Sequence, residues 1–229
     1  MKHLLTILTI IIMGSFVSNA LASDVYITQS GASFTANINQ DGQTNKYGVS
    51  GTVATHTGDS QTLDIDQIGN TNTIAASVVG ATQTITLKQE GNSNTSTVSV
   101  GENSAAADNS IVQTITGSSN TTTVNVGKTA ASGDADIDLV ATGDSNTVTI
   151  NENSTASMIG DDKKVTSVTI SGSGNTVTTT HAGAGDHDTT LSHTGSSGTF
   201  AITQDGAHDS TVVMTTNGAG HSVTITMDD

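Results

Sequence analysis

The feature that most constrains this chain is a short turn motif that recurs along it: a glycine, two small residues, an asparagine and a threonine. Alternating apolar and polar residues flank each copy. The copies begin at Gly69, Gly91, Gly117, Gly143 and Gly172. A single strand-turn-strand unit of this kind cannot bury its own apolar face, so neighbouring units must stack to make a core. The repeat therefore predicts a stack of similar units rather than a globular enzyme.

The spacing of the glycines gives the size of the unit. Gly58, Gly69, Gly80 and Gly91 stand 11 residues apart, which fits a strand of about six residues and a turn of about five. Two such segments form a coil of 22 residues, and later coils reach 29 residues. Their extra residues fall at alternate turns, so we expect them to share one edge of a solenoid. The three longer segments are 101–110, 127–136 and 151–164.

These spacings predict an all-β protein. We expect a β-solenoid of about eight coils, 22–29 residues each, that occupies residues 23–229 as a single domain. The chain contains no proline, which suits paired strands and tight turns because proline removes a donor from a sheet. The main turns are expected near Gly42, Gly69, Gly91, Gly117, Gly143, Gly172, Gly195 and Gly218.

Amides recur at fixed offsets from the glycines. Glutamine precedes several glycines by two residues, and asparagine follows many of them by three. Even offsets before a turn and odd offsets after it point to the inward face of a strand. Stacked inward, each amide can donate to one neighbour and accept from the other, which forms a ladder. The predicted ladder and turn residues are Gln29, Gln40, Gln67, Gln89 and Gln204; Asn45, Asn72, Asn94, Asn120, Asn146 and Asn175; and Gly31, Gly42, Gly69, Gly91, Gly117, Gly143 and Gly172.

Threonines follow the same spacing on the opposite face. They stand four and six residues after the glycines, at even offsets that point outward. We therefore expect two parallel threonine rows along the outside of the stack. The rows comprise Thr35, Thr73, Thr95, Thr121, Thr147, Thr176 and Thr199, and Thr97, Thr123, Thr149, Thr178 and Thr224.

Residues 1–22 have the pattern of a secretory signal peptide. Lys2 and His3 precede a mostly apolar stretch, and Ala20-Leu21-Ala22 is a small-residue cleavage site before Ser23. The apolar stretch is shorter than the roughly 20 residues that a membrane span needs. We therefore expect a secreted protein without membrane insertion after cleavage. An uncleaved anchor is the alternative.

The charge balance excludes several partners. The formal net charge is −15, which disfavours nucleic acid and anionic membrane surfaces. The chain has no cysteine, so disulfides do not stabilise it, and hydrogen-bonded stacking is a candidate replacement. Aromatic residues make up 2% of the chain, too few for a conventional packed core of this length.

No catalytic, cofactor-binding or metal-binding motif stands out. The histidines show no zinc-type spacing, and we interpret His193 and His221 as ladder residues in glutamine and asparagine positions. The histidines of the carboxyl-terminal half could also make stacking sensitive to pH. The acidic groups lack a calcium-binding repeat or loop and are interpreted as solvated charge that prevents sideways association. Neither an enzyme nor a cofactor is expected.

The amino-terminal repeats resemble a known family. Gln29-Ser-Gly31-Ala-Ser-Phe34-Thr-Ala36-Asn-Ile-Asn-Gln40 is similar to the curlin repeat of bacterial curli fibres, Gln-x-Gly-x-x-Asn-x-Ala-x-x-x-Gln, with Phe34 in the asparagine position. The first half of the motif recurs at Gln67 and Gln89, and Gln204 echoes it near the end. The strict motif covers the first third of the chain.

The resemblance implies a secreted subunit that stacks end to end into amyloid-like fibres of a biofilm matrix and supports adhesion and aggregation. It also implies a Gram-negative-type bacterium, an outer-membrane secretion pore and a nucleating partner subunit. The separate pore-targeting segment of that family is not evident, because the repeats begin at Val25. Two binding functions remain open: ice binding through the threonine rows, and a surface or phage adhesin that uses the three longer segments.

Overall fold

The computed structural model is built from β-strands. It describes residues 23–41, 44–48, 53–69, 71–91, 93–101, 108–117, 119–127, 135–143, 145–153, 164–172, 174–183, 185–195, 197–218 and 220–228. There is no helix among these residues, and therefore none long and apolar enough to cross a membrane. The expected signal peptide lies outside the described residues.

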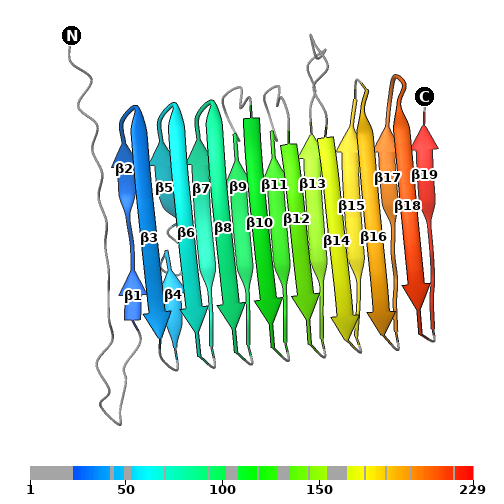
Figure 1. Ribbon diagram of the computed structural model, residues 1–229, viewed down its shortest axis with the longest axis horizontal. Coiled ribbons are helices and arrows are strands. Elements are labelled where there is room, and N and C mark those ends of the chain that lie inside the picture. Colours follow the sequence, from blue (N-terminus) through cyan, green and yellow to red (C-terminus); the bar gives the residue numbers. More distant parts are fainter. Residues whose placement is uncertain are drawn as a thin grey trace.

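The strands form two parallel sheets (Figure 1). Sheet 1 has eleven strands, three to six residues long: β1 (Ser23–Val25), β2 (Thr28–Ser30), β4 (Asn45–Tyr47), β5 (Ala54–Thr57), β7 (Ile74–Val79), β9 (Ser96–Val100), β11 (Thr122–Val126), β13 (Val148–Asn153), β15 (Val177–Ala182), β17 (Ile202–Asp205) and β19 (Ile225–Asp228). Sheet 2 has eight strands, eight or nine residues long: β3 (Ser33–Asp41), β6 (Ser60–Ile68), β8 (Thr82–Glu90), β10 (Asp108–Thr116), β12 (Ala135–Thr142), β14 (Lys164–Gly172), β16 (His187–Gly195) and β18 (Ser210–Asn217).

The chain alternates between the sheets and winds into a β-solenoid, which confirms the predicted fold class. About six turns, from β7 to β18, have one strand in each sheet. At the amino-terminal end the sheet 1 strands are split, so that β1 and β2, and then β4 and β5, occupy one level each. Strands of adjacent turns pair in register. Ser60 pairs with Thr82, for example, and Ala135 pairs with Lys164.

The solenoid has two edges. Strands of sheet 2 lead into strands of sheet 1 through the recurring glycine motif, and we call this side the main-turn edge. Strands of sheet 1 return to sheet 2 at the opposite side, which we call the insertion edge. The three longer segments each follow a sheet 1 strand and precede a sheet 2 strand, so their attachment points share the insertion edge. Most of their residues lie outside the described part of the chain.

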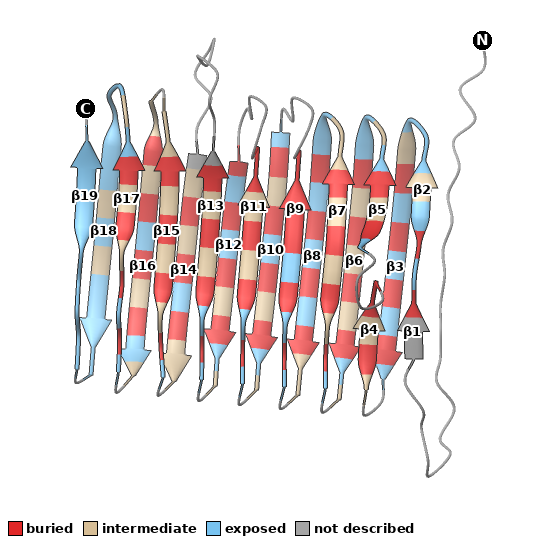
Figure 2. Cartoon of the chain, turned by 180° about the vertical axis from the view of Figure 1, so that it is seen from behind, coloured by how far each residue is buried: buried red, intermediate tan, exposed pale blue. Residues whose placement is uncertain are grey.

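Alternation along each strand creates the core between the sheets (Figure 2). In β8, for example, Gln83, Ile85, Leu87 and Gln89 are buried while the residues between them are exposed. The period of two places apolar side chains of both sheets on the inside, where they form one continuous cluster along the stack. Buried isoleucine, valine and leucine therefore form most of the core of a chain with few aromatic residues.

Glycine is required at the main turns because successive turns approach each other closely. Gly143 has φ +154°, and a Cβ atom there would overlap the carbonyl oxygen of Gly117. Gly117 and Gly172 stand in the same relation to the glycine of the preceding turn. Only a residue without a side chain permits this stacking distance.

Candidate functional site: polar ladders and the open end

Six asparagines form a hydrogen-bonded ladder inside the main-turn edge. The Nδ2 of each donates to the Oδ1 of the one before it, at 2.5–3.1 Å. All six are buried. The first member, Asn45, also donates to the backbone carbonyls of Gln40 and Ile68. The ladder runs through Asn45, Asn72, Asn94, Asn120, Asn146 and Asn175.

Three glutamines form a second, shorter ladder in sheet 2. Gln67 Nε2 donates to Gln40 Oε1 at 2.7 Å, and Gln89 Nε2 donates to Gln67 Oε1 at 3.0 Å. Each Nε2 also donates to a backbone carbonyl of the following sheet 1 segment, at 2.9–3.1 Å. Ile115 occupies the next level above Gln89, so the ladder ends there and Gln89 Oε1 has no hydrogen-bond partner.

The structure does not bring Gln29 and Gln204 into this ladder. Both lie in sheet 1, where Gln29 pairs with His56 and Gln204 pairs with His181. Their neighbouring glycines, Gly31 and Gly206, belong to the insertion edge, whereas the Gln40 ladder precedes main turns. The predicted placement of these two glutamines was wrong because the glycine spacing is the same at both edges. Gly42 lies outside the described residues.

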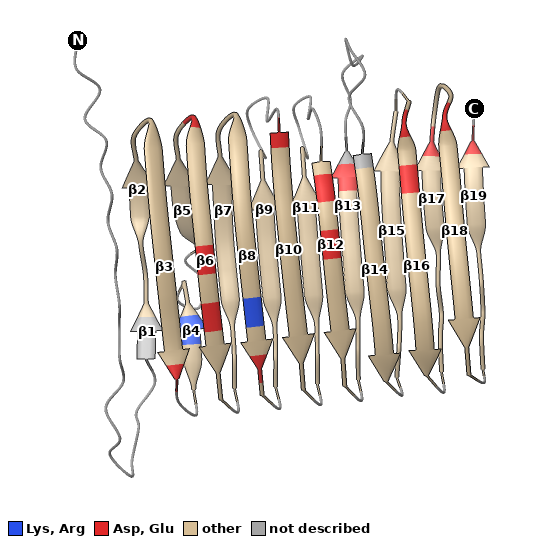
Figure 3. Ribbon diagram, viewed as in Figure 1, with Lys and Arg blue, Asp and Glu red and all other residues tan. Residues whose placement is uncertain are grey.

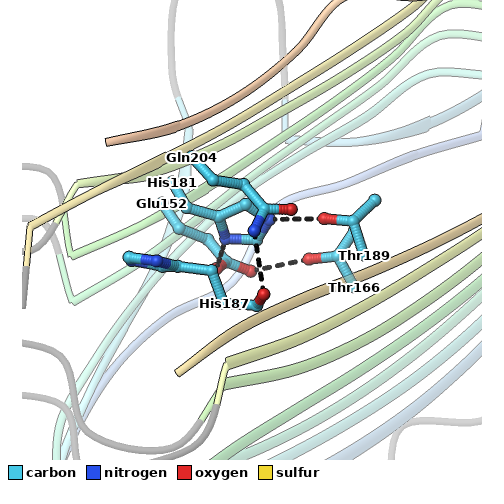
Figure 4. A network of polar contacts seen from close by, with 6 residues as sticks. All are labelled: Glu152, Thr166, His181, His187, Thr189 and Gln204. Carbon is cyan, nitrogen blue, oxygen red and sulfur yellow. Dashed lines mark hydrogen bonds and ion pairs between the residues drawn. The ribbon is translucent and has the colours of Figure 1, made fainter. Parts of the chain in front are cut away.

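Sequence spacing did not anticipate a buried polar network in the insertion edge (Figure 4). Glu152 Oε2 lies 2.6 Å from His181 Nδ1, and His181 Nε2 lies 2.9 Å from Thr189 Oγ1. The other carboxylate oxygen accepts from Thr166 at 3.1 Å. Gln204 donates to the backbone carbonyl of His187 at 2.8 Å.

A hydroxyl, an imidazole and a carboxylate in series have the order of a nucleophile, a base and an orienting acid. Glu152, His181 and Thr189 are each at most 1% exposed, so a substrate cannot reach them. The arrangement therefore satisfies buried polar groups and holds sheet 1 against sheet 2. A signal for it was present in the sequence. Nine residues after the main-turn glycines stand Val78, Val100 and Val126, and then Glu152, His181 and Gln204.

A second amide row was also missed. Gln61, Gln83 and Asn109 stack in register near the insertion edge and are buried. Their side-chain nitrogen and oxygen atoms have no hydrogen-bond partner. Stacking in register is therefore not sufficient for a hydrogen-bonded ladder, and the Gln40 row differs because each of its amides also reaches a backbone carbonyl.

Aromatic side chains fill the interior of the amino-terminal end. The His56 ring stacks on Phe34 at 5.0 Å between centroids, and its Nε2 contacts the Tyr47 hydroxyl. Burial lowers the pKa of His56 to about 4 and raises the pKa of Tyr47 above its ordinary value. Both groups are therefore neutral at pH 7.

Histidines replace the amide ladders at the carboxyl-terminal end. His193 occupies the level above Ile170 in the glutamine row, and its Nε2 lies 2.6 Å from the Asn175 amide. His193 packs edge-on against Phe200, 4.8 Å between centroids, and against His221 at 5.3 Å. Burial, followed by the neighbouring His221, lowers the pKa of His193.

No metal site is formed by the described residues: in no place do three or more histidine, aspartate or glutamate side chains converge. A pocket of about 390 Å³ lies beside the insertion edge of the last turns. It is open to solvent and lined by Asp186, His187, Asp188, Asp209, Ser210 and Thr211.

The two ends of the solenoid differ in exposure (Figure 2). In β3, the first strand of sheet 2, the inward residues Phe34, Ala36 and Ile38 are at most 2% exposed. At the other end, Ile225 and Met227 of β19 are 43% and 50% exposed, although they continue the inward rows of sheet 1. Among the described residues, β18 and β19 are also the last strands of their sheets, and each pairs with a neighbouring strand on one side only. We call this surface the open end.

Comparison with known proteins adds no relative: no family model, no curated protein and no solved structure matches the chain.

Proposed function

We propose that this protein is a structural subunit that polymerises end to end. In this proposal the open end of one molecule adds the first turn of the next, so that sheet 1 continues through the fibre. The observation that carries the proposal is the last turn that the structure describes, where apolar inward side chains are exposed and the strands pair on one side only. Exposed, flat and apolar edge strands of this kind pair with another chain by β-augmentation.

The rows at the two ends match. In sheet 1 the inward row that ends at Ile225 begins at Ile27. Ile27 directly precedes Thr28, and the pairing of Thr28 with Thr55 fixes the level of both residues. In sheet 2 the row that ends at Met214 begins at Ile38. A second copy stacked one level beyond β19 would therefore place Ile27 on Ile225, so that an apolar row of sheet 1 meets an apolar row without any change of register. Sheet 2 has one level fewer than sheet 1, so Ile38 of that copy would lie two levels beyond Met214.

The curlin resemblance supports the same function and extends it. By this resemblance the subunit is secreted into an extracellular matrix through an outer-membrane pore, where a nucleating subunit starts the fibre and the fibre supports adhesion and aggregation. The −15 net charge keeps free subunits soluble until they meet an end.

The experiment compares fibre formation by three forms of the secreted chain, residues 23–229. The wild type should form filaments that bind thioflavin and diffract with a spacing of about 4.8 Å. Ile225→Lys places a charge in the inward row of the open end and should slow elongation at least tenfold. Thr226→Lys, the matched control, places the same charge on the outward side of the same strand and should leave elongation close to wild type.

A wild type that remains monomeric at high concentration, with and without seeds, contradicts the proposal. Equal elongation by Ile225→Lys and Thr226→Lys contradicts growth through the open end. Both variants should keep the strand content of the wild type, because β19 is exposed in the monomer.

A second candidate function is ice binding. The observation that favours it is that Thr97, Thr123, Thr149 and Thr178 lie in register on the outer face of sheet 1. Regular threonine spacing on a flat face could match a crystal lattice, although strands also favour threonine in general. Thermal hysteresis of the monomer tests this alternative, and its absence excludes it. The adhesin alternative depends on segments outside the described residues.

A further inference from the structure

The outer faces of the two sheets differ in charge (Figure 3). Sheet 2 carries Asp41, Asp64, Asp66, Glu90, Asp108, Asp136, Asp138 and Asp188, and its described side chains include one lysine, Lys88. Sheet 1 is different. From β7 to β15, its described outward side chains are threonine, serine, asparagine, alanine and valine, without a charge. The only ionisable carboxylate on these strands, Glu152, points inward.

The uncharged face is also regular. Thr97, Thr123, Thr149 and Thr178 form its central column. A parallel column two residues later is linked by side-chain hydrogen bonds, because Asn151 donates to Asn125 at 2.9 Å and Asn125 donates to Ser99 at 3.5 Å. The threonine column repeats one side chain over four successive levels, and rows of identical side chains are the surface from which steric zippers are built.

We propose that the outer face of sheet 1 between β7 and β15 is a lateral interface that pairs with the same face of a second copy. This inference rests on the proposed fibre and goes beyond it, since it assigns the sideways contact rather than the growing end. A second copy carries the same −15 net charge. It therefore meets repulsion at sheet 2 and can approach closely only through the uncharged face. A two-fold axis would make the contact self-complementary.

The area of this face determines whether monomers can pair through it or only fibres can. Five strands at about 4.8 Å and five residues at about 3.3 Å give about 400 Å² per molecule. A pair of monomers would bury about 800 Å², below the 1,200–2,000 Å² that is typical of specific interfaces. Monomers should therefore not pair. In a fibre the face repeats in every subunit, so the contacts add along the length and lateral pairing follows elongation.

The test counts filaments per bundle by electron microscopy in the secreted chain, residues 23–229. The variant Thr123→Asp/Thr149→Asp places two carboxylates on adjacent strands of the uncharged face. The matched control, Thr116→Asp/Thr142→Asp, places two on adjacent strands of sheet 2 in the same coils. We expect bundles of two or more filaments from the wild type and the control, and a several-fold excess of single filaments from the sheet 1 variant. High salt should restore its bundles.

Bundling of the sheet 1 variant to the same extent as the control overturns the inference. Single filaments from the wild type also overturn it, while the proposed end-to-end growth survives. A wild type that forms no filaments removes the fibre and the lateral interface together. Thermal hysteresis from the wild-type monomer, lost in the sheet 1 variant, assigns the face to ice instead and likewise overturns the inference.

Discussion

The two edges of this solenoid satisfy their buried polar side chains in different ways. At the main-turn edge, one residue type repeats, and six asparagines satisfy one another along the stack. At the insertion edge, the corresponding interior row changes from His56 through three valines to Glu152, His181 and Gln204. There, polar groups depend on particular partners across the core.

The difference has a physical cause. An amide is both donor and acceptor, so a row of amides can continue without limit and leaves only its ends unpaired. A carboxylate only accepts, and an imidazole offers at most two positions, so each needs a chosen neighbour. The main-turn edge is therefore suited to continuation from one turn to the next, and the insertion edge is suited to fixing local register. Four substitutions test this comparison.

The largest effect is expected from a side chain in the closest approach between main turns. Gly143→Ala would push a Cβ atom into the Gly117 carbonyl and should lower the free energy of unfolding by more than about 4 kcal/mol. Gly185→Ala is the control at the insertion edge. Its nearest foreign atom is 3.9 Å away, and only its φ of +88° is unfavourable, so about 1–2 kcal/mol is expected. Denaturant unfolding measures both, and similar losses would refute the close-packed main-turn edge.

The buried pair at the insertion edge should come next. His181→Val leaves the Glu152 carboxylate buried without its partner and should cost about 3–5 kcal/mol at pH 7. The double variant Glu152→Val/His181→Val extends the valine row and should recover most of that loss. A double variant less stable than His181→Val, measured by the same unfolding assay, would show that the pair contributes more than it costs.

A break in the middle of the asparagine ladder should cost somewhat less. Asn120→Ala leaves Asn94 Oδ1 and Asn146 Nδ2 without partners, which predicts a loss of about 2–4 kcal/mol. Gln89→Leu is the control at the end of a ladder. The leucine removes the donor to Gln67 Oε1 and to the Thr95 carbonyl but packs on Ile115, so we expect a smaller loss, of about 1–2 kcal/mol. Equal losses would mean that position within a ladder is irrelevant.

The smallest effect is a dependence of stability on pH that comes from His56 at the insertion edge. The pKa of His56 is about 4 in the folded protein and 6.5 in the unfolded chain, so the unfolded chain binds more protons between these values. The contribution of neutral His56 to the free energy of unfolding is complete above pH 6.5. As the pH falls towards 4, the free energy of unfolding decreases by about 2–3 kcal/mol. His56→Gln cannot titrate and should flatten unfolding free energy against pH in this window. An unchanged slope would exclude His56 as the cause.

The β-solenoid was predictable because the glycine turns recur in the sequence at regular intervals. Equal spacing from Gly69 to Gly91 fixes where the chain turns, and alternation between turns fixes which side chains face inward. The turn that a glycine occupies was not fixed by spacing, because both edges can use glycine at an interval of 11 residues. Gln29 and Gln204 were therefore assigned to the wrong row.

The polar network was harder to predict because its contacts cross between the sheets. Glu152 and His181 share an inward offset, which spacing could have revealed, but Thr189 reaches His181 from sheet 2. That contact depends on how far apart the sheets pack, which no one-dimensional pattern records. End-to-end stacking was predicted from the repeat, but the exposed apolar residues at the open end were not, because β18 and β19 repeat the pattern of the other strands.

The central claim is that the rows of one molecule continue into the next, and an engineered disulfide tests it most directly. The chain has no cysteine, so Ile27→Cys/Ile225→Cys provides one thiol at each end of a single row. Adjacent levels about 4.8 Å apart fall within the Cα separation that a disulfide accepts. Oxidation of preformed fibres should give a ladder of covalent oligomers in denaturing, non-reducing gels, and Ile27→Cys/Thr226→Cys should not. Fibres that form normally but yield only monomers from Ile27→Cys/Ile225→Cys would contradict the account.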